Sequence, residues 1–319
     1  MAIEVKSAGK GKGNGLFATR DLNVGDEIFS ELPFVWAHHG SIAGHCGACG
    51  VSVESPQAFV AVACGGKNCM VMYCSDMCRI TAWETHHCIL CGADEGALSP
   101  HERCARKVLA MILTRLRGTI PMHTPDSPHP KFLDVATGEA ISGEQVEQVA
   151  EEVLRGFQRQ SYTYAMHVFR GGCAMPAALF QELLRDNYFE GYLEQGRKAA
   201  HSLFNDDDVA AGAAFLGHCL SVHFYDELMG MFLCNNQTVQ VVSFVNGTQE
   251  TTYLQGTALY STYSKANHAC VASWHNLPLY RRVGSGGVGD LETVLTAVQD
   301  VSSHRECVGV RVVAARDIK

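Results

Sequence analysis

The stretch that decides the fold is residues 46–91, CGACGVSVESPQAFVAVACGGKNCMVMYCSDMCRITAWETHHCILC, which holds eight of the 14 cysteines of the chain. Its metal-ligand residues are spaced Cys46-x2-Cys49, Cys64-x4-Cys69, Cys74-x3-Cys78 and His87-x3-Cys91. Eight such ligands complete two tetrahedral zinc sites and leave no open position for a catalytic water. The spacing therefore predicts two structural zinc ions. An isolated cysteine would more often be a plain buried thiol.

The segment has too few aliphatic residues to form a core of its own, so we expect metal binding to supply its folding free energy. Its end, His86-His87-Cys88-Ile89-Leu90-Cys91, offers two histidines as the ligand. We favour His87 because it gives an H-x3-C spacing with Cys91, and we expect His86 and Cys88 to be spectators.

The composition of the whole chain narrows the class of protein. The chain has 319 residues, 47% hydrophobic and 18% charged, which is enough for a large core or for two to three smaller ones. The net charge of -8 argues against direct nucleic-acid binding. We find no apolar run of about 18 residues and no secretory h-region, so we expect no membrane span and a location in the cytoplasm and/or nucleus, with reduced thiols.

The pattern along the chain predicts strands, a cysteine-rich insert, a helical block and strands again. The turn signal Asn23-Val24-Gly25-Asp26 predicts a hairpin or short meander between two strand-like runs. We expect a loop over 119–139 and helices over 99–118, 143–159, 176–200 and 206–229. The last third predicts strands over 238–245, 251–254 and 306–314.

A second motif, Lys12-Gly13-Asn14-Gly15, lies near the N-terminus. Two glycines allow the backbone to approach a ligand closely, although an ordinary hairpin explains the same pattern. It does not match a dinucleotide-binding fingerprint, since neither a third glycine at the required spacing nor a helix follows.

Met72-Tyr73-Cys74-Ser75 and Ala82-Trp83, together with the cysteine spacing, resemble the MYND zinc finger. The x4 spacing of the second pair departs from the usual x2. The resemblance implies interleaved ligand sets, which are Cys46, Cys49, Cys74 and Cys78 for one zinc and Cys64, Cys69, His87 and Cys91 for the other. Such fingers contact proteins, often proline-rich peptides, and a purely architectural role is the alternative.

The order of the motifs extends the resemblance to the SET and MYND domain proteins. The opening glycine motif is followed by the finger, by Cys234-Asn235-Asn236-Gln237-Thr238-Val239, by a G-x-x-L-Y-x-x-x-S-x-x-N-H-x-C element over 256–270 and by a final strand near 312–319. The resemblance implies an α+β fold, a SET-type β-fold of small sheets with a pseudoknot-like crossing and a helical insert. We divide it into 1–44 (N-terminal SET part), 45–92 (MYND finger), 93–230 (helical insert) and 231–319 (C-terminal SET part).

The resemblance also implies a function, S-adenosylmethionine-dependent N-methylation of a protein lysine, in a histone or another protein. Lys12, Gly13, Asn14 and Gly15 would hold the methionine end of the cofactor, and Asn267 with His268 would hold its amino group and adenine side. Taken alone, Asn267 and His268 would be an ordinary turn asparagine and core histidine. The family's N-H-S-C-x-P-N is here Asn267-His268-Ala269-Cys270-Val271-Ala272-Ser273.

In the family a G-E-E run, the catalytic tyrosine and a third cysteine cluster follow, so we expect that tyrosine beyond Lys319. We expect structural roles for Tyr260 and Tyr263. The alternatives are an inactive SET and MYND scaffold for protein–protein interaction, or an unrelated intracellular zinc protein with an α+β body. An acidic chain suits lysine-rich partners such as histone tails.

Overall fold

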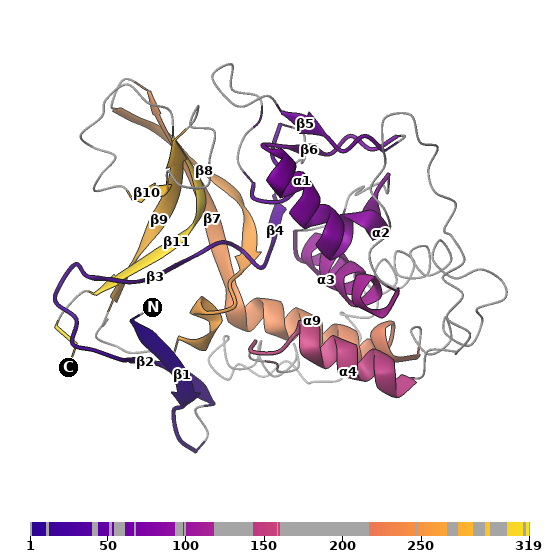
Figure 1. Cartoon of the computed structure of the whole chain (residues 1–319), viewed down its shortest axis with the longest axis horizontal. Coiled ribbons are helices and arrows are strands. Elements are labelled where there is room, and N and C mark those ends of the chain that lie inside the picture. Colours follow the sequence, from indigo (N-terminus) through magenta and orange to yellow (C-terminus); the bar gives the residue numbers. More distant parts are fainter. Residues whose placement is uncertain are drawn as a thin grey trace, which may run out of the picture.

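The computed structural model describes residues 2–10, 13–39, 44–50, 53, 61–66, 68–92, 98, 100–117, 143–157, 159, 217–245, 248–266, 274–282, 291–293, 305–314 and 317–318. The sheets formed by β1–β4 and β7–β11 lie on one side of the molecule, and the helices lie on the other together with the small β5–β6 sheet (Figure 1). The mixed α+β class is thus confirmed. The pseudoknot-like crossing was expected at Asn267 and His268, which lie outside the described residues.

The described strands form four sheets. The first pairs β1 (Ile3–Ser7) with β2 (Asn14–Ala18). The second has the order β10 (Leu291–Thr293), β9 (Trp274–Arg282), β11 (Arg305–Ala314) and β3 (Glu27–Glu31). The third has the order β4 (Val35–His38), β8 (Thr248–Leu259) and β7 (Asn236–Val245), and the fourth pairs β5 (Val62–Ala63) with β6 (Met72–Tyr73).

The hairpin predicted at residues 23–26 is wrong, although the turn itself forms. Gly25 has a φ of 88°, and the Asp26 amide donates to the Asn23 carbonyl at 3.0 Å. The flanking strands nevertheless belong to different sheets, because β2 pairs with β1 and β3 pairs with β11. The turn is hydrogen-bonded to the end of β11 instead, since the Gly25 amide donates to the Ala314 carbonyl at 2.8 Å.

The strands predicted over 238–245 and 306–314 are confirmed as β7 and β11, and the one predicted over 251–254 is the middle of the longer strand β8. β9, which contains Pro278, was not predicted, and proline lacks the amide donor that a strand paired on both sides needs. Pro278 lies opposite Val310 of β11, and β10 pairs only with residues 279–281. Among the described residues, the proline therefore lies where β9 pairs with β11 alone.

Helix α3 (Pro100–Arg117) is the centre of the helical side and confirms the helix predicted over 99–118. Every residue from 104 to 114 is buried. The helix packs against β4, β8, α4 (Gly143–Val153), α9 (Val222–Asn235) and η1 (Trp83–His87). Because α3 is covered on all sides, its polar side chains need hydrogen-bond partners inside the protein, just as its apolar side chains need packing partners.

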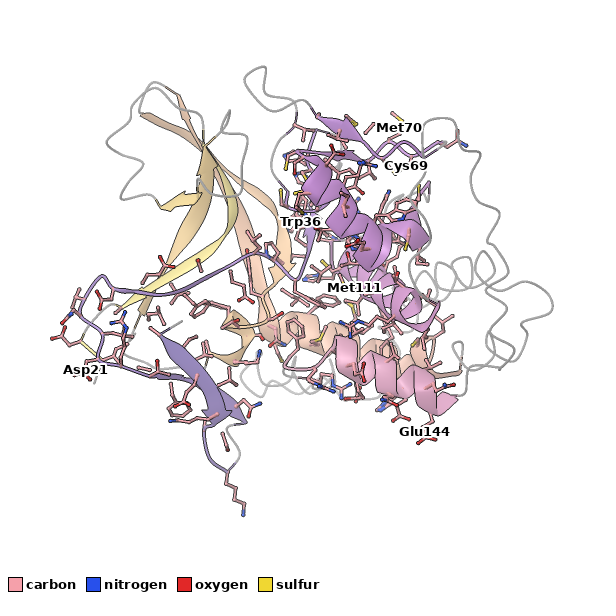
Figure 2. All side chains as sticks on the ribbon, viewed as in Figure 1. Asp21, Trp36, Cys69, Met70, Met111 and Glu144 are labelled. Carbon is pink, nitrogen blue, oxygen red and sulfur yellow. The ribbon has the colours of Figure 1, made fainter. Side chains whose placement is uncertain are left out.

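Two cationic side chains of α3 bind the backbone of β4. The Lys107 ammonium donates to the Trp36 carbonyl at 2.9 Å, and the Arg103 guanidinium donates to the His38 carbonyl at 3.0 Å. Four residues of helix and two residues of strand both span about 6 to 7 Å, so the spacings match. Side chains fill the space between α3 and β4 around Trp36 and Met111 (Figure 2).

The other two helical predictions are met in part. α4 ends at Val153, short of the predicted 159, and the chain turns at Gly156 with a φ of 97°. The helix predicted over 206–229 is interrupted at residues 220–221, and α9 then runs to Asn235, across the division placed at 230/231. The segment 176–200 lies outside the described residues. Within the described part of the chain, no helix is long and apolar enough to cross a membrane.

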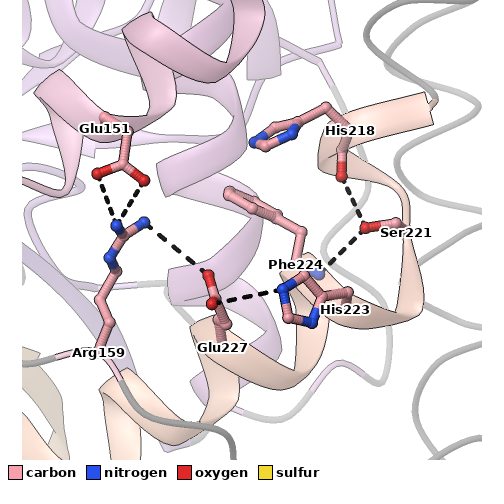
Figure 3. Close-up of polar contacts among 7 residues, drawn as sticks. All are labelled: Glu151, Arg159, His218, Ser221, His223, Phe224 and Glu227. Atoms are coloured by element: carbon pink, nitrogen blue, oxygen red, sulfur yellow. Dashed lines mark hydrogen bonds and ion pairs between the residues drawn. The ribbon is translucent and has the colours of Figure 1, made fainter.

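Polar contacts explain why α9 begins at Val222, after the interruption, and link α9 to α4 (Figure 3). The Ser221 hydroxyl accepts from the Phe224 amide at 3.1 Å, which is the geometry of an N-cap. The Arg159 guanidinium binds Glu151 of α4 at 2.6 Å and lies 3.9 Å from Glu227 of α9. The two helices are therefore linked by an ion-pair network as well as by the core.

Candidate metal and cofactor sites

The β5–β6 hairpin explains how the cysteines of the finger become interleaved. Val62 pairs with Tyr73, and the Cys64 amide donates to the Val71 carbonyl at 3.1 Å. Cys64 and Cys69 therefore lie at the tip of the hairpin, whereas Cys74 follows β6 at its base. Neighbours in the sequence thus go to opposite ends of the finger.

The first cluster joins four sulfur atoms that all lie within 4.8 Å of one another, those of Cys46, Cys49, Cys74 and Cys78. Cys74 Sγ lies 3.6 Å from both Cys49 Sγ and Cys78 Sγ. Helix α1 (Asp76–Ala82) carries Cys78 in its first turn, and the Ser75 hydroxyl accepts from the Cys78 amide at 3.2 Å as an N-cap. The cap fixes the start of the helix and so the position of the fourth ligand.

The second cluster joins Cys64, Cys69, His87 and Cys91, again within 4.8 Å. His87 Nε2 lies 3.1 Å from Cys64 Sγ and 3.4 Å from Cys69 Sγ, and Cys64 Sγ lies 3.5 Å from Cys91 Sγ. Nine residues of largely helical chain separate Cys78 from His87, a rise of about 13 Å. That rise carries the chain from the first cluster to the second.

The donor atoms fit zinc. Tetrahedral sites with Zn–S bonds of about 2.3 Å and Zn–N bonds of about 2.0 to 2.1 Å have S···S edges of about 3.8 Å and S···N edges of about 3.5 Å. The quoted S···S separations are 3.5 and 3.6 Å, and the S···N separations are 3.1 and 3.4 Å. Both clusters could therefore hold a zinc ion after small adjustments.

The donor groups of the second cluster have shifted pKa values because they lie close together. A hydrogen bond with Cys64 holds the pKa of Cys69 well below its usual range, whereas the corresponding bond raises the pKa of Cys91. Burial lowers the pKa of His87, but contacts with the Cys64 and Cys69 sulfurs raise it more, to about 9. Without metal the group thus shares protons among its donors. Metal binding would release them, because the ligand forms are thiolate and neutral imidazole.

The two adjacent histidines have different surroundings. His87 points into the second cluster, and the rings of Tyr73 and Trp83 stand edge-on to it at 5.8 and 5.9 Å. His86 is buried with its Nδ1 at 2.8 Å from the Thr85 hydroxyl, and burial holds its pKa well below the usual range. The neighbouring Cys88 faces α3, 3.5 Å from the Thr114 hydroxyl.

Gly66 is a feature of the second cluster that sequence reasoning missed. A Cβ atom at this position would lie 2.4 Å from Cys91 Sγ and 3.5 Å from Cys64 Sγ. The x4 loop closes through two left-handed residues, Gly65 at a φ of 81° and Asn68 at 67°. The double glycine inside Cys64-x4-Cys69 was the available signal, and the extra length of this pair is taken up by these turns.

One of the two segments expected to hold the cofactor is largely described, and it lies beside a short turn of the chain. Gly13, with a φ of 65°, and Asn14 are exposed at the β1–β2 turn, and Gly15 is buried in β2. β2 contacts η4 (Tyr263–Lys265), the turn that ends just before the expected Asn-His pair. Lys12 and that pair, Asn267 and His268, lie outside the described residues.

β2 and η4 also share one small core. Its fully buried members are Ala2, Leu22, Ile28, Phe29, Val312 and Ala314. Leu16 and Ala18 from β2 and Tyr263 from η4 pack against them. The position of β2 relative to η4 is thus set by packing between regions far apart in the sequence.

Comparison with known proteins gives consistent relatives. No family model matches the chain. It is 30% identical over 116 residues to the human Protein-lysine N-trimethyltransferase SMYD5, a match covering 28% of each chain. It is 31% identical over 87 residues to a SET and MYND domain-containing protein of Dictyostelium discoideum, covering 26% of this chain and 15% of the relative.

A longer match, to the mouse Protein-lysine N-trimethyltransferase SMYD5, is 23% identical over 314 residues and covers 85% of this chain and 71% of the relative. The matched stretches of this chain thus cover only 28% of the length of the human relative and 15% of the length of the Dictyostelium relative. Three relatives with these names agree with the motif order and with the paired clusters. The chain is therefore a relative of the SET and MYND domain proteins.

Proposed function

We propose that this chain acts in S-adenosylmethionine-dependent N-methylation of a protein lysine. The observation that supports the proposal is the contact between β2, which contains Asn14 and Gly15, and η4, which ends two residues before Asn267. The names of the human and mouse relatives, both protein-lysine N-trimethyltransferases, support the same reaction class.

The backbone around Gly13 suits an approaching ligand, because no atom lies within 4 Å of the position of a Cβ there. In the proposal Lys12, Gly13, Asn14 and Gly15 hold the methionine end of the cofactor. Asn267 and His268 hold its amino group and adenine side. When bound, S-adenosylmethionine supplies an activated methyl group on a sulfonium.

The protein's own task is to bring a neutral lysine amine into line with that methyl group and to exclude water, and such positioning supplies much of the rate. No described tyrosine is assigned to this task. Tyr260 is buried, and Tyr263 packs against the small core, so both receive structural roles.

We further propose that each cysteine cluster holds one structural zinc ion. The substrate is a histone or another protein with an accessible lysine, met in the cytoplasm or the nucleus. A proline-rich peptide is the proposed partner of the finger, which exposes Met70, Met77 and Ile80. Met70 lies on the outer side of the finger next to Cys69 (Figure 2).

The first experiment is calorimetric titration of the zinc-loaded chain with S-adenosylmethionine, with S-adenosylhomocysteine as a second ligand. We expect saturable binding with one site per chain. An absence of binding by folded protein containing two zinc ions would contradict the proposal. A second assay follows transfer of labelled methyl groups to histone and non-histone proteins, and binding without transfer would favour the scaffold alternative.

A further inference from the structure

The turn between β8 and Asn267 is rigidly closed by its own backbone. The Ser264 amide donates to the Tyr260 carbonyl at 3.0 Å, and the Lys265 amide donates to the Thr262 carbonyl at 3.0 Å. The Ala266 amide then donates to the Tyr263 carbonyl at 2.9 Å. The direction in which the chain leaves Ala266 is therefore fixed by the direction in which the turn begins.

One side chain from a distant strand sets that beginning. Glu31, the last residue of β3, accepts from the Thr262 amide through Oε1 at 2.8 Å and from the Tyr263 amide through Oε2 at 3.0 Å. These amides belong to the first residues of the η4 turn, where backbone donors have no partner within the turn. Two bonds from one planar carboxylate fix orientation as well as distance.

Glu31 is itself held in place. It lies opposite Val310 in the β3–β11 register, and the neighbouring Phe34 amide donates to the Leu259 carbonyl at 2.8 Å, just before the turn. Strand β3 therefore carries the carboxylate on a paired backbone, and the chain after it runs beside the end of β8. The position of Glu31 follows from the sheet and not from a flexible loop.

The other end of the turn is also anchored. The Lys265 ammonium donates to the Ser261 carbonyl, and it lies against Gly156, where a Cβ would be 3.0 Å from Nζ. Gly156 belongs to the turn after α4 and has a φ of 97°. The η4 turn thus meets the helical side through Lys265, the small core through Tyr263, and β3 through Glu31.

From this geometry we infer that Glu31 is a positioning residue for the proposed cofactor site, because it holds the η4 turn beside β2. The inference rests on the proposed function. It adds a specific role to a residue that the motif comparison did not assign, and it makes cofactor affinity depend on a carboxylate that need not touch the cofactor.

The test measures S-adenosylmethionine binding and amide hydrogen exchange of the 319-residue, zinc-loaded chain for the wild type, Glu31→Gln, Glu31→Ala and Glu147→Gln. Glu147 is exposed on α4, so Glu147→Gln is a control for the change of charge. Glu31→Gln keeps nearly the same shape and one acceptor oxygen, but it places an amide N–H₂ group against the second amide.

We expect about tenfold weaker binding for Glu31→Gln, a larger loss for Glu31→Ala and a change of less than about twofold for Glu147→Gln. The amides of Thr262 and Tyr263 should also exchange faster in Glu31→Gln than in the wild type, and fastest in Glu31→Ala. Their exchange should not change in Glu147→Gln. Positioning predicts that affinity falls in the same order as exchange at Thr262 and Tyr263 rises. General destabilisation would instead lower affinity only in proportion to the melting temperature.

The outcomes separate the two claims. Wild-type protein that binds no S-adenosylmethionine overturns the proposed function and this inference with it. Wild-type binding that both Glu31 variants retain, at unchanged affinity, overturns only the inference. If Glu31→Ala does not fold, Glu31→Gln decides alone, and unchanged exchange at Thr262 and Tyr263 in that variant also refutes the inference.

Discussion

Replacing Gly66 by alanine tests whether the second cysteine cluster is a zinc site of the geometry described above. The new Cβ would lie 2.4 Å from Cys91 Sγ, whereas an ordinary contact needs at least 3.4 Å. The sulfur atom, or the loop that carries Gly66, must therefore move by about 1 Å. Metal–ligand distances tolerate only about 0.2 Å, so a fully ligated zinc ion cannot absorb this shift.

The cost depends on the metal. In metal-free protein the Cys91 side chain can rotate away, so Gly66→Ala should change the free energy of unfolding by less than about 1 kcal/mol. In zinc-loaded protein the same rotation removes one of four ligands. We expect at least about 100-fold weaker binding at one of the two sites, equivalent to about 2.7 kcal/mol.

The matched control is Gly65→Ala. Gly65 adopts a φ of 81° but has open space around the position of a Cβ, so alanine there brings backbone strain of about 1 to 2 kcal/mol without a clash. That strain should lower the melting temperature of the zinc-loaded protein without displacing a ligand. The two neighbouring glycines thus separate a steric effect on a ligand from a conformational effect on the loop.

The assay is competition for zinc with a chromophoric chelator, with metal analysis by mass spectrometry after dialysis. Wild-type and Gly65→Ala protein should retain two zinc ions per chain under conditions in which Gly66→Ala retains one. Retention of two ions at unchanged affinity by Gly66→Ala would refute the reasoning. So would an equal loss of zinc from both variants, because backbone strain would then be the cause.

Three further predictions concern single side chains. His87→Ala should reduce bound zinc from two ions to one, whereas His86→Ala should lower stability but retain two, and the reverse result would exchange their roles. Burial lowers the pKa of His101, so only the unfolded chain gains a proton as pH falls below about 6.5 and stability is lost there. His101→Phe should make the fall in melting temperature between pH 7 and 5 shallower, and an unchanged slope would contradict this. Lys107→Ala should destabilise the protein by about 2 to 4 kcal/mol in denaturant unfolding, because it leaves the Trp36 carbonyl without its donor, and Lys107→Arg should recover part of the loss.

The sequence predicts well those parts of the molecule in which local chemistry decides the structure. The four ligand pairs follow from their spacing, and helix α3 follows from its helical periodicity and from the sequence signals Ser99, Pro100 and Gly118, all visible in a short window. The strands β7 and β11 follow from their apolar, β-branched composition. Each of these signals is stronger than any competing local structure.

Tertiary competition explains the parts that could not be predicted. The turn at residues 23–26 looks like a hairpin, yet the C-terminal strand takes the pairing edge of β3, and no local pattern reports a partner nearly 290 residues away. The role of Glu31 is hidden for the same reason, since its partners are two backbone amides of a distant turn. Backbone amides have no residue signature, so motif comparison does not find such contacts.

The lack of aliphatic residues in the finger has a consequence beyond metal binding. Trp83 and Ile89 belong to the same buried cluster as Val108 and Leu109 of α3, so the finger shares a core with the helical region and has none of its own. α3 in turn binds the edge of β4 through Lys107, and β4 pairs with β8, which leads directly to the η4 turn. A ligand that binds only the folded state stabilises every element that must be folded to bind it. Zinc binding at the two clusters, as proposed, would therefore stabilise α3 and β4 as well as the finger, and with them β8, the strand that leads to the η4 turn.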